Sequence, residues 1–263
     1  MTTLPELSDA SITLDNGVAV LTLERDDVRN ALTGTALIDD IIKVCNWINR
    51  DYAVGALVIT GGGKAFSSGG NVKDMYERKG NFSGDPIQVQ NNYRHGIQLM
   101  TKAVYEVEAP VIAALNGAAV GAGLDLACLC DIRIGCEHTK VGATFLNLGI
   151  IPGDGGAWIL PRIVGEQCAA ELTFSGRIVG PDEATALGIL LKSVPAEELK
   201  AQAVEMARQF AAKPRQASRM TKRLLRAGQR MALNDFLDYC AGQQSLCHTS
   251  SEHREALRQF LDT

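Results

Sequence analysis

The chain has 263 residues, of which 46% are hydrophobic and 21% are charged, and its formal net charge is −4 at pH 7. These values are typical of a globular protein with a substantial core, built as one α/β domain or as one domain with a helical extension. The negative charge argues against a general nucleic-acid-binding protein, although a local basic patch is compatible with it.

The first half of the chain reads as strands alternating with helices. Asp15-Asn16-Gly17 is a strong turn signal between two alternating apolar segments, and this pattern predicts a β-hairpin. Apolar residues then recur at helical spacing. The elements expected up to residue 106 are strands over 11–14, 18–23 and 56–60, helices over 34–49 and 87–106, and a loop around 77–88.

The second half begins with strands and ends in helices. Strands are expected over 110–115 and 132–135, and helices over 124–130, 157–164 and most of the chain after 166. Glycines and prolines punctuate this last part. Strands that alternate with helices, followed by a run of helices, predict a parallel α/β core with a helical C-terminal region.

The N-terminus and the cysteines indicate a compartment. Residues 1–10 contain no basic segment followed by an apolar one, so we expect no secretory signal. No apolar run approaches the roughly 20 residues that span a bilayer, so we expect no membrane partner. The seven cysteines stand mostly among apolar residues, which is typical of buried thiols in a reducing compartment. We therefore predict a cytoplasmic protein.

The sequence predicts no metal site. Its four histidines are scattered and form no HExxH-type cluster. Cys128 and Cys130 are separated by one residue, whereas redox and zinc pairs of cysteines need a gap of two.

Small residues at 116–123 join the strand at 110–115 to a helix that carries Asp125. The first N–H groups of such a helix have no intrahelical partner, and small side chains let another molecule approach them closely. Asp125 is the only ionisable side chain between Glu108 and Asp131. A carboxylate beside exposed N–H donors suits enolate or oxyanion chemistry, whereas an aspartate at a helix start is often only a favourable charge.

A second turn, Ser-Gly-Gly at 68–70, follows the strand at 56–60 and precedes a helix start at Asn71. The segment is no phosphate loop, because Val58 and Ala65 stand where the Walker pattern needs Gly and Ser or Thr. Two such strand-to-helix turns offer two backbone donors. A pair of donors that converges on one oxygen makes an oxyanion hole.

These two turns carry a family resemblance. Their sequences are KAFSSGGNVKDM at 64–75 and NGAAVGAGLDL at 116–126. Further matching segments lie at 25–32, 174–177, 183–184, 187–188, 251–256 and 260–261. Over nearly the whole chain these ordered motifs resemble those of the crotonase superfamily, also called the enoyl-CoA hydratase/isomerase family.

The resemblance implies a fold, a substrate and an assembly. The fold would be an α/β crotonase-like spiral of repeated ββα units, with a core over 1–195 that holds an acyl-CoA site. A helical C-terminal region over 196–263 would take part in assembly as a homotrimer or a dimer of trimers. Family members act on acyl-CoA thioesters, so coenzyme A is part of the substrate and no separate cofactor is expected. A nucleic-acid partner is not expected.

The resemblance also implies which residues bind the thioester. Family members stabilise the enolate of the thioester carbonyl with two backbone N–H groups, which would belong to Gly70 and Ala122. Ala122 departs from the usual glycine, but the donor is the backbone. Contacts with coenzyme A would come from Val28, Ala65, Ser67, Ser68, Gly69, Val72 and Lys73.

The carboxylates depart from the pattern of the hydratases in the family. Those enzymes place one glutamate where Asp125 stands and a second where Phe145 stands, so Phe145 becomes a candidate wall of the acyl pocket. Asp154 lies in a loop where some members carry a functional aspartate. We predict Asp125 as the general acid/base and Asp154 as its partner. The alternative for Asp154 is a turn residue that caps the helix at 157–164.

These residues favour hydration of a 2-enoyl-CoA through a thioester enolate. Double-bond isomerisation is the first alternative, because it needs one carboxylate and no activated water, and hydrolysis or dehalogenation with Asp154 as nucleophile is the next. A rival of another class is a non-catalytic or RNA-binding protein of the same fold, supported by a run of basic residues. We expect that run to form a solvated helix face or a subunit contact. It consists of Arg215, Arg219, Lys222, Arg223, Arg226 and Arg230.

Overall fold

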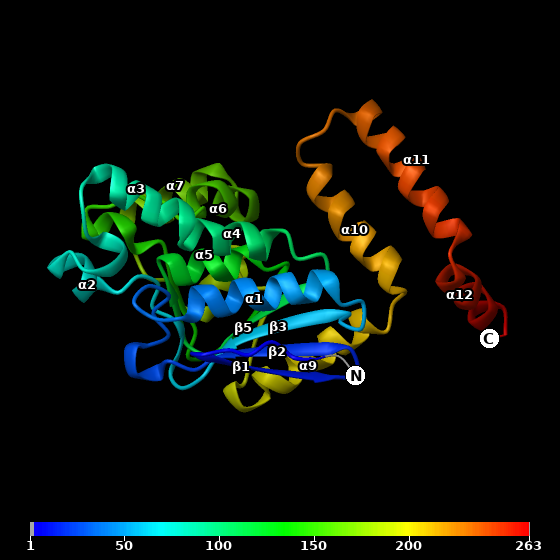
Figure 1. Ribbon diagram of the computed structural model, residues 1–263, viewed down its shortest axis with the longest axis horizontal. Coiled ribbons are helices and arrows are strands. Elements are labelled where there is room, and N and C mark those ends of the chain that lie inside the picture. The colour runs from blue at the N-terminus through cyan, green and yellow to red at the C-terminus, as the bar shows by residue number, and fades with distance from the viewer. Residues whose placement is uncertain (1–2, 263) are drawn as a thin grey trace.

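The computed structural model describes residues 3–262 as two β-sheets with helices packed on them, and with further helices at the C-terminal end that extend away from the sheets (Figure 1). The larger sheet has the order β1-β2-β3-β5-β7-β9. Its strands are β1 (Ala10–Asp15), β2 (Val18–Leu23), β3 (Ala56–Gly61), β5 (Val111–Leu115), β7 (Ile132–Cys136) and β9 (Lys192–Val194). The smaller sheet contains β4 (Ala65–Ser67), β6 (Ala118–Val120) and β8 (Lys140–Gly142).

The helices occupy the remaining length between and after these strands. They are α1 (Leu37–Arg50), α2 (Val72–Glu77), α3 (Pro86–His95), α4 (Ile97–Tyr105), α5 (Ala122–Leu129), α6 (Gly156–Val164), α7 (Glu166–Ser175), α8 (Pro181–Ala186), α9 (Ala196–Ala211), α10 (Arg215–Ala227), α11 (Leu233–Thr249) and α12 (Ser251–Leu261). Short 3₁₀ turns cover Asp26–Val28, Gly80–Phe82 and Thr144–Leu148.

A ββα unit repeats along the first part of the chain. Its copies are β1-β2-α1, β3-β4-α2, β5-β6-α5 and β7-β8-α6, with α3 and α4 inserted after α2. In the last three copies the first strand joins the larger sheet and the second strand joins the smaller one. Only the β1–β2 pair is antiparallel; the other pairs in the two sheets are parallel. The α/β spiral of ββα units expected from the sequence is therefore confirmed.

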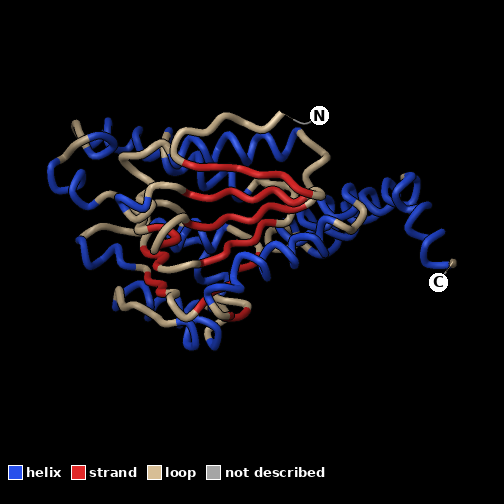
Figure 2. The backbone as a smooth tube through the Cα atoms, turned by 90° about the horizontal axis from the view of Figure 1, so that it is seen from below, coloured by secondary structure: helices blue, strands red, loops and turns tan. Residues whose placement is uncertain are grey.

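Helices cover both faces at the centre of the larger sheet, which explains why β3 and β5 read as continuous apolar runs. In β3, Leu57 and Ile59 belong to the core that includes α1, whereas Ala56 and Val58 belong to a second core formed with α9. The strands lie between these helical layers in Figure 2. The two cores hold the carboxyl ends of the strands in fixed positions.

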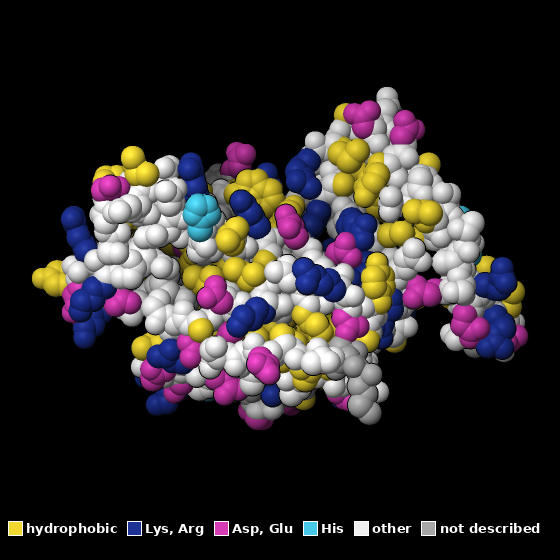
Figure 3. Space-filling view, viewed as in Figure 1, with side chains coloured by type: hydrophobic (Ala, Val, Ile, Leu, Met, Phe, Trp, Pro, Cys, Tyr) yellow, Lys and Arg dark blue, Asp and Glu magenta, His cyan; other side chains and the backbone are white. Residues whose placement is uncertain are grey.

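The helices α10, α11 and α12 leave the body of the molecule, and the C-terminus lies far from the sheets (Figure 1). None of the described residues of α11 and α12 is buried. Hydrophobic side chains gather over α10 and α11 in Figure 3. The exposed large hydrophobic residues of these two helices include Leu225, Leu233 and Leu237. The division of the chain at residue 195 stays a prediction.

Four short strands were missed by the sequence patterns. β4, β6, β8 and β9 have three residues each, so they are too short to show an alternation of apolar and polar residues. The helix expected over 87–106 is also broken, at Gly96, into α3 and α4. The expected hairpin, by contrast, is formed by β1 and β2.

Candidate active site

The two strand-to-helix turns lie side by side. β4 and β6 are neighbouring parallel strands, so the turns that follow them leave the same edge of the small sheet. Gly69 has a φ of +79°, and a Cβ there would lie 2.6 Å from the oxygen of Val120 and 2.9 Å from the nitrogen of Ala122. Only glycine fits this crossing, because it tolerates the left-handed backbone and leaves room for the second turn. The turn at 68–70 and the start of α5 thus form one site.

The N–H groups of Gly70 and Ala122 are available to a ligand. Both residues line a cavity of about 220 Å³. Within residues 3–262, neither N–H donates to a carbonyl or to a side chain, whereas the neighbouring Gly121 N–H donates to Gly142 at 2.9 Å. Two unpaired donors on the wall of one cavity are the arrangement that an oxyanion requires.

The rest of the cavity wall is mainly apolar. Phe145 is 6% exposed and lines the cavity, and its place in an acyl pocket stays a prediction. Met75, Phe82 and Ile97 add further apolar walls, and the side chains of Thr33 and Thr144 also reach it. Such a wall excludes water, which strengthens every polar interaction inside the cavity.

The structure separates the roles of the two carboxylates. Asp154 is 6% exposed and lines the cavity, and its Oδ1 has no hydrogen-bond partner among the described residues. Asp125 is 4% exposed, does not line this cavity within the described part of the chain, and accepts a hydrogen bond from the N–H of Gly156 at 3.0 Å. Asp125 therefore lies behind the wall, against the N-terminus of α6.

Burial makes both carboxyl groups weaker acids. Burial raises the pKa of Asp154 to about 6. Burial and the charge of Asp154 raise the pKa of Asp125 well above its usual range, against the opposing effect of the Gly156 N–H. Titratable groups whose environments separate their pKa values can serve as base and acid at the same pH. Both shifts favour the protonated carboxyl form, and the charge of Asp154 adds to the shift of Asp125.

Asp154 does not cap α6, so that alternative is wrong. The N-cap residue is Gly155, and no side chain caps the helix from that position. The loop is instead held from α4 through its backbone. Thr101 Oγ1 donates to the oxygen of Asp154 at 2.6 Å, and Gln98 Nε2 donates to the oxygen of Gly153 at 3.0 Å. Since both contacts use carbonyl groups, the carboxylate of Asp154 is left to the cavity.

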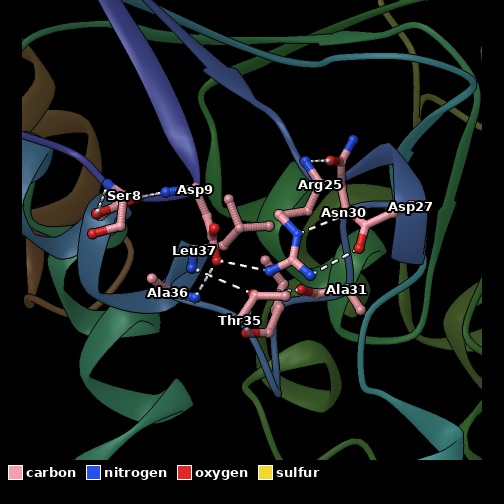
Figure 4. Close-up of polar contacts among 11 residues, drawn as sticks. Ser8, Asp9, Arg25, Asp27, Asn30, Ala31, Thr35, Ala36 and Leu37 are labelled. Carbon is pink, nitrogen blue, oxygen red and sulfur yellow. Dashed lines mark hydrogen bonds and ion pairs between the residues drawn. The ribbon is translucent and has the colours of Figure 1, made fainter.

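The loop at 25–30 packs against the turn at 65–69. Ser68 Oγ donates to Val28 O at 3.3 Å, and Ser67 Oγ donates to Asn30 O at 2.7 Å. Figure 4 shows how the loop is fixed from its other side: Arg25 contacts Asp9 and Asp27, and the N–H of Arg25 donates to Asn30 Oδ1. These contacts prearrange the loop before any ligand binds.

The residues expected to bind coenzyme A differ in exposure. Ser68 and Val72 line the cavity, and Lys73 is exposed in the first turn of α2. The side chains of Ala65 and Ser67 are buried, so these two residues can offer only backbone groups to a ligand. Val28 is partly buried beside Ser68.

The central basic residues of α10 are buried and bond to other parts of the chain. The prediction that they form a solvated face or a subunit contact is therefore wrong. Arg219 is 2% exposed and donates to the carbonyl oxygens of Ile48, Asp51 and Val54. Lys222 Nζ lies 2.6 Å from a carboxylate oxygen of Asp131. The remaining contacts of the run join Arg223 to Glu108, Arg226 to Asp131 and Arg215 to the carbonyls of Tyr52 and Ala53. The run anchors α10 to the core, which removes the main support for RNA binding.

Sequence patterns did not identify several cavity residues that lie between residues 77 and 100. Asn81, Asn92 and Tyr93 come from this region, and Tyr93 is half-buried. Burial and the charge of Asp154 raise the pKa of the Tyr93 hydroxyl. Asn81 stands in the expected loop and Asn92 and Tyr93 stand in the expected helix, and neither pattern shows which side chains turn inward.

No group of three or more His, Cys, Asp or Glu side chains within residues 3–262 could hold a metal ion. In the same part of the chain, none of the helices combines the length and the apolar character needed to cross a bilayer.

The fold and the site define an α/β protein in which two backbone donors and a carboxylate share one apolar cavity. The chain belongs to the enoyl-CoA hydratase/isomerase family, whose sequence profile matches residues 13–263. It is 32% identical to a crotonyl-CoA hydratase of Syntrophomonas wolfei, covering 93% of this chain and 92% of the relative. It is 30% identical to a short-chain-enoyl-CoA hydratase of Clostridium acetobutylicum, covering 98% and 96%. A crystal structure of an enoyl-CoA hydratase from Bacillus anthracis matches with a TM-score of 0.90 at 29% identity, covering 97% and 96%.

Proposed function

We propose that the protein hydrates a 2-enoyl-CoA thioester through an enolate bound by the N–H groups of Gly70 and Ala122. The observation that carries this proposal is the position of Asp154, a buried carboxylate with an unpartnered oxygen in the cavity that those two donors line. The relatives named as crotonyl-CoA and short-chain-enoyl-CoA hydratases support the same reaction.

The proton steps follow from the ionisation of Asp154. The ionised carboxylate takes a proton from water while the water oxygen adds to Cβ, and the electron pair of the double bond moves to the thioester oxygen. The two N–H groups stabilise that negative oxygen, and losing one such donor typically costs about 2.7–4 kcal/mol. The enolate collapses as Asp154 returns the proton to Cα, so one carboxyl group serves as base and then as acid.

Asp125 is the partner of Asp154 in this mechanism, although the sequence pattern gave it the leading role. Its carboxyl group holds the first turn of α6 through Gly156 N–H, next to the loop that carries Asp154. Burial and the charge of Asp154 raise the pKa of Asp125 and so favour its neutral form, which does not repel an ionised Asp154. Asp125 is thus proposed as a positioning residue that also keeps the site electrically suitable for one charge.

One observation favours double-bond isomerisation as a second candidate. Phe145 occupies a wall position of the cavity, and Asp154 is the carboxylate that lines it within the described residues. One carboxylate is enough to move a proton between Cα and Cγ. Incubation of 2-enoyl-CoA and 3-enoyl-CoA in water labelled with ¹⁸O distinguishes the two reactions. Hydration introduces the label into a 3-hydroxyacyl product, whereas isomerisation gives an unlabelled enoyl product. If neither product forms, both proposals are refuted.

We also propose the binding residues and the assembly that the family resemblance implies. Coenzyme A would contact Val28, the turn at 65–69, Val72 and Lys73. Exposed leucines on α11 and α12, which include Leu237, Leu246 and Leu257, support a homotrimer or a dimer of trimers. Light scattering after size exclusion tests the assembly: a trimer of 28.2 kDa chains has a mass of about 85 kDa. Cytoplasmic localisation stays a prediction that fractionation would test.

A further inference from the structure

Tyr93 brings a phenol ring against the loop that carries Asp154. The ring comes from α3, and its Cε1 atom lies 3.5 Å from the position that a Cβ of Gly153 would take. Tyr93 and Asp154 also line the same cavity. The phenol therefore packs beside the residue that precedes Asp154, on the part of the wall from which the carboxylate reaches the cavity.

The hydroxyl of Tyr93 makes no hydrogen bond within residues 3–262. It does interact with Asp154 electrostatically, because burial and the charge of Asp154 raise the pKa of this hydroxyl. Asp154 Oδ1 is buried and also has no hydrogen-bond partner in the same part of the chain. A small polar molecule placed between two such groups can hydrogen-bond to both of them.

The other uncharged polar side chains of the cavity wall are engaged or lie elsewhere. Thr144 Oγ1 lies 3.6 Å from the position of a Cβ at Gly121, and Asn81 Nδ2 lies 3.8 Å from the position of a Cβ at Gly96. Four others hydrogen-bond to the backbone, and they are Thr33, Ser68, Asn92 and Asn147. Among the described residues, the hydroxyl of Tyr93 is the one that adjoins the Asp154 loop and keeps its hydrogen-bonding capacity for a ligand.

Water can approach this part of the wall from a second hollow. Tyr93 lines both the inner cavity and a groove between α2, α3 and the loop at 148–153. Met75 and Phe82 are further walls of both hollows, and they offer water no strong hydrogen bond. A water held inside a protein typically makes about three hydrogen bonds, so a polar group at this junction determines where an entering water stays.

Addition of water to a double bond requires a water molecule that is held in one orientation. In the proposed reaction Asp154 takes one hydrogen of that water, so the second hydrogen needs an acceptor while the oxygen faces Cβ. A misplacement of about 1 Å can cost roughly 100-fold in rate. A phenol oxygen can accept this hydrogen bond, and the hydroxyl stays neutral because its pKa is raised above the ordinary value of 10.0.

We propose that Tyr93 is a catalytic residue of the hydration step, whose hydroxyl oxygen accepts a hydrogen bond from the attacking water while Asp154 takes the other hydrogen as a proton. The bond from the water oxygen to Cβ forms as the bond to that proton breaks, and the electron pair of the double bond moves toward the thioester oxygen. The retained hydrogen belongs to the new 3-hydroxyl group and stays directed at Tyr93. This role rests on the proposed function, because it takes the reaction to be hydration.

The variant Tyr93→Phe removes the hydroxyl and keeps the ring that packs on Gly153. It should lower kcat for hydration of a 2-enoyl-CoA about tenfold, the factor for one lost hydrogen bond, and leave KM within about threefold. Tyr76→Phe is the matched control, because Tyr76 is 89% exposed and does not line the inner cavity among the described residues. Turnover in Tyr93→Phe within about twofold of the unmodified protein would overturn the role.

A second measurement separates the holding of water from a structural role. In deuterium oxide, Asp154 removes a Cα proton of saturated butyryl-CoA, and the enolate takes up a deuteron that came from the solvent. This exchange needs the enolate and adds no water, so mass spectrometry should find its rate in Tyr93→Phe within about twofold of the unmodified protein. Equal losses of hydration and exchange would overturn the role, because Tyr93 would then support the fold or the enolate.

The same assays distinguish a failure of this role from a failure of the proposed reaction. If the unmodified protein does not hydrate a 2-enoyl-CoA, the reaction is refuted and the role of Tyr93 falls with it. If the unmodified protein and Tyr93→Phe hydrate the substrate equally well, the reaction is retained and the role of Tyr93 alone is overturned.

Discussion

Replacing Asp154 with asparagine should stabilise the folded protein at neutral and higher pH. The side chain is 6% exposed, and its Oδ1 has no partner within the described residues. Ionisation there is unfavourable, because burial raises the pKa from 3.8 to about 6. Asparagine has nearly the same shape and carries no charge at any pH, so the variant avoids this cost.

The magnitude follows from the linkage between protonation and folding. Between pH 3.8 and about 6 the folded state binds more protons at this site than the unfolded state, so stability is lost as pH rises through this window. A shift of about two pKa units corresponds to about 3 kcal/mol once both states are ionised. About 2 kcal/mol of this appears between pH 4.5 and pH 8.

Urea unfolding of the two proteins at pH 4.5 and pH 8 measures the effect. The free energy of unfolding of Asp154→Asn relative to the unmodified protein should rise by about 2 kcal/mol between the two pH values. Asp125 contributes to the pH dependence of both proteins, and because the charge of Asp154 raises its pKa, removing that charge can only add to the difference in the same direction. A variant that is less stable at pH 8, or a difference that does not change with pH, would refute the assignment of Asp154 as a buried, weakly solvated carboxyl group.

Three further predictions concern the turn, the helix anchor and the ionisation of the site. Gly69→Ala should destabilise the protein by about 1–3 kcal/mol and lower kcat about 100-fold, because the new Cβ displaces the second turn. Gly80 also has a positive φ, but a Cβ there would meet no atom within 4 Å, so Gly80→Ala should keep its activity in thermal melts and turnover assays. Arg219→Met should cost about 3 kcal/mol in urea unfolding and Arg230→Met, at the exposed end of the same run, less than about 0.5 kcal/mol; equal losses would contradict the anchoring role. The value of kcat/KM should rise with pH through about 6 and then level, about tenfold between pH 5 and pH 8, and a flat profile would exclude Asp154 as the base.

The longer helices and strands of the fold were predictable from the sequence. β3 and β5 read correctly because both their faces are buried, and α1 reads correctly because its apolar residues recur on one face. β4 and β6 were not predicted, since strands of three residues show no periodicity. Yet these two strands bring the turns together, so the convergence of the donors depends on a pairing that no local pattern encodes.

The residues of the candidate site were predictable from the sequence, but the direction in which each side chain points was not. Asp125 and Asp154 stand in recognisable segments, but only packing decides that Asp154 faces the cavity and Asp125 faces the first turn of α6. The basic run of α10 illustrates the same limit. Its spacing does not show that Arg219 and Lys222 pack against the carbonyl groups of the core.

The central claim is that Asp154 acts on a thioester bound at Gly70 and Ala122. Steady-state hydration of a 2-enoyl-CoA by the unmodified protein, Asp154→Asn and Asp125→Asn tests it most directly. General acid–base catalysis contributes about 10²–10⁴ in rate, so Asp154→Asn should lower kcat by that factor while the dissociation constant of a saturated acyl-CoA stays within threefold. Asp125→Asn should lower kcat less. Unchanged turnover in Asp154→Asn would contradict the claim.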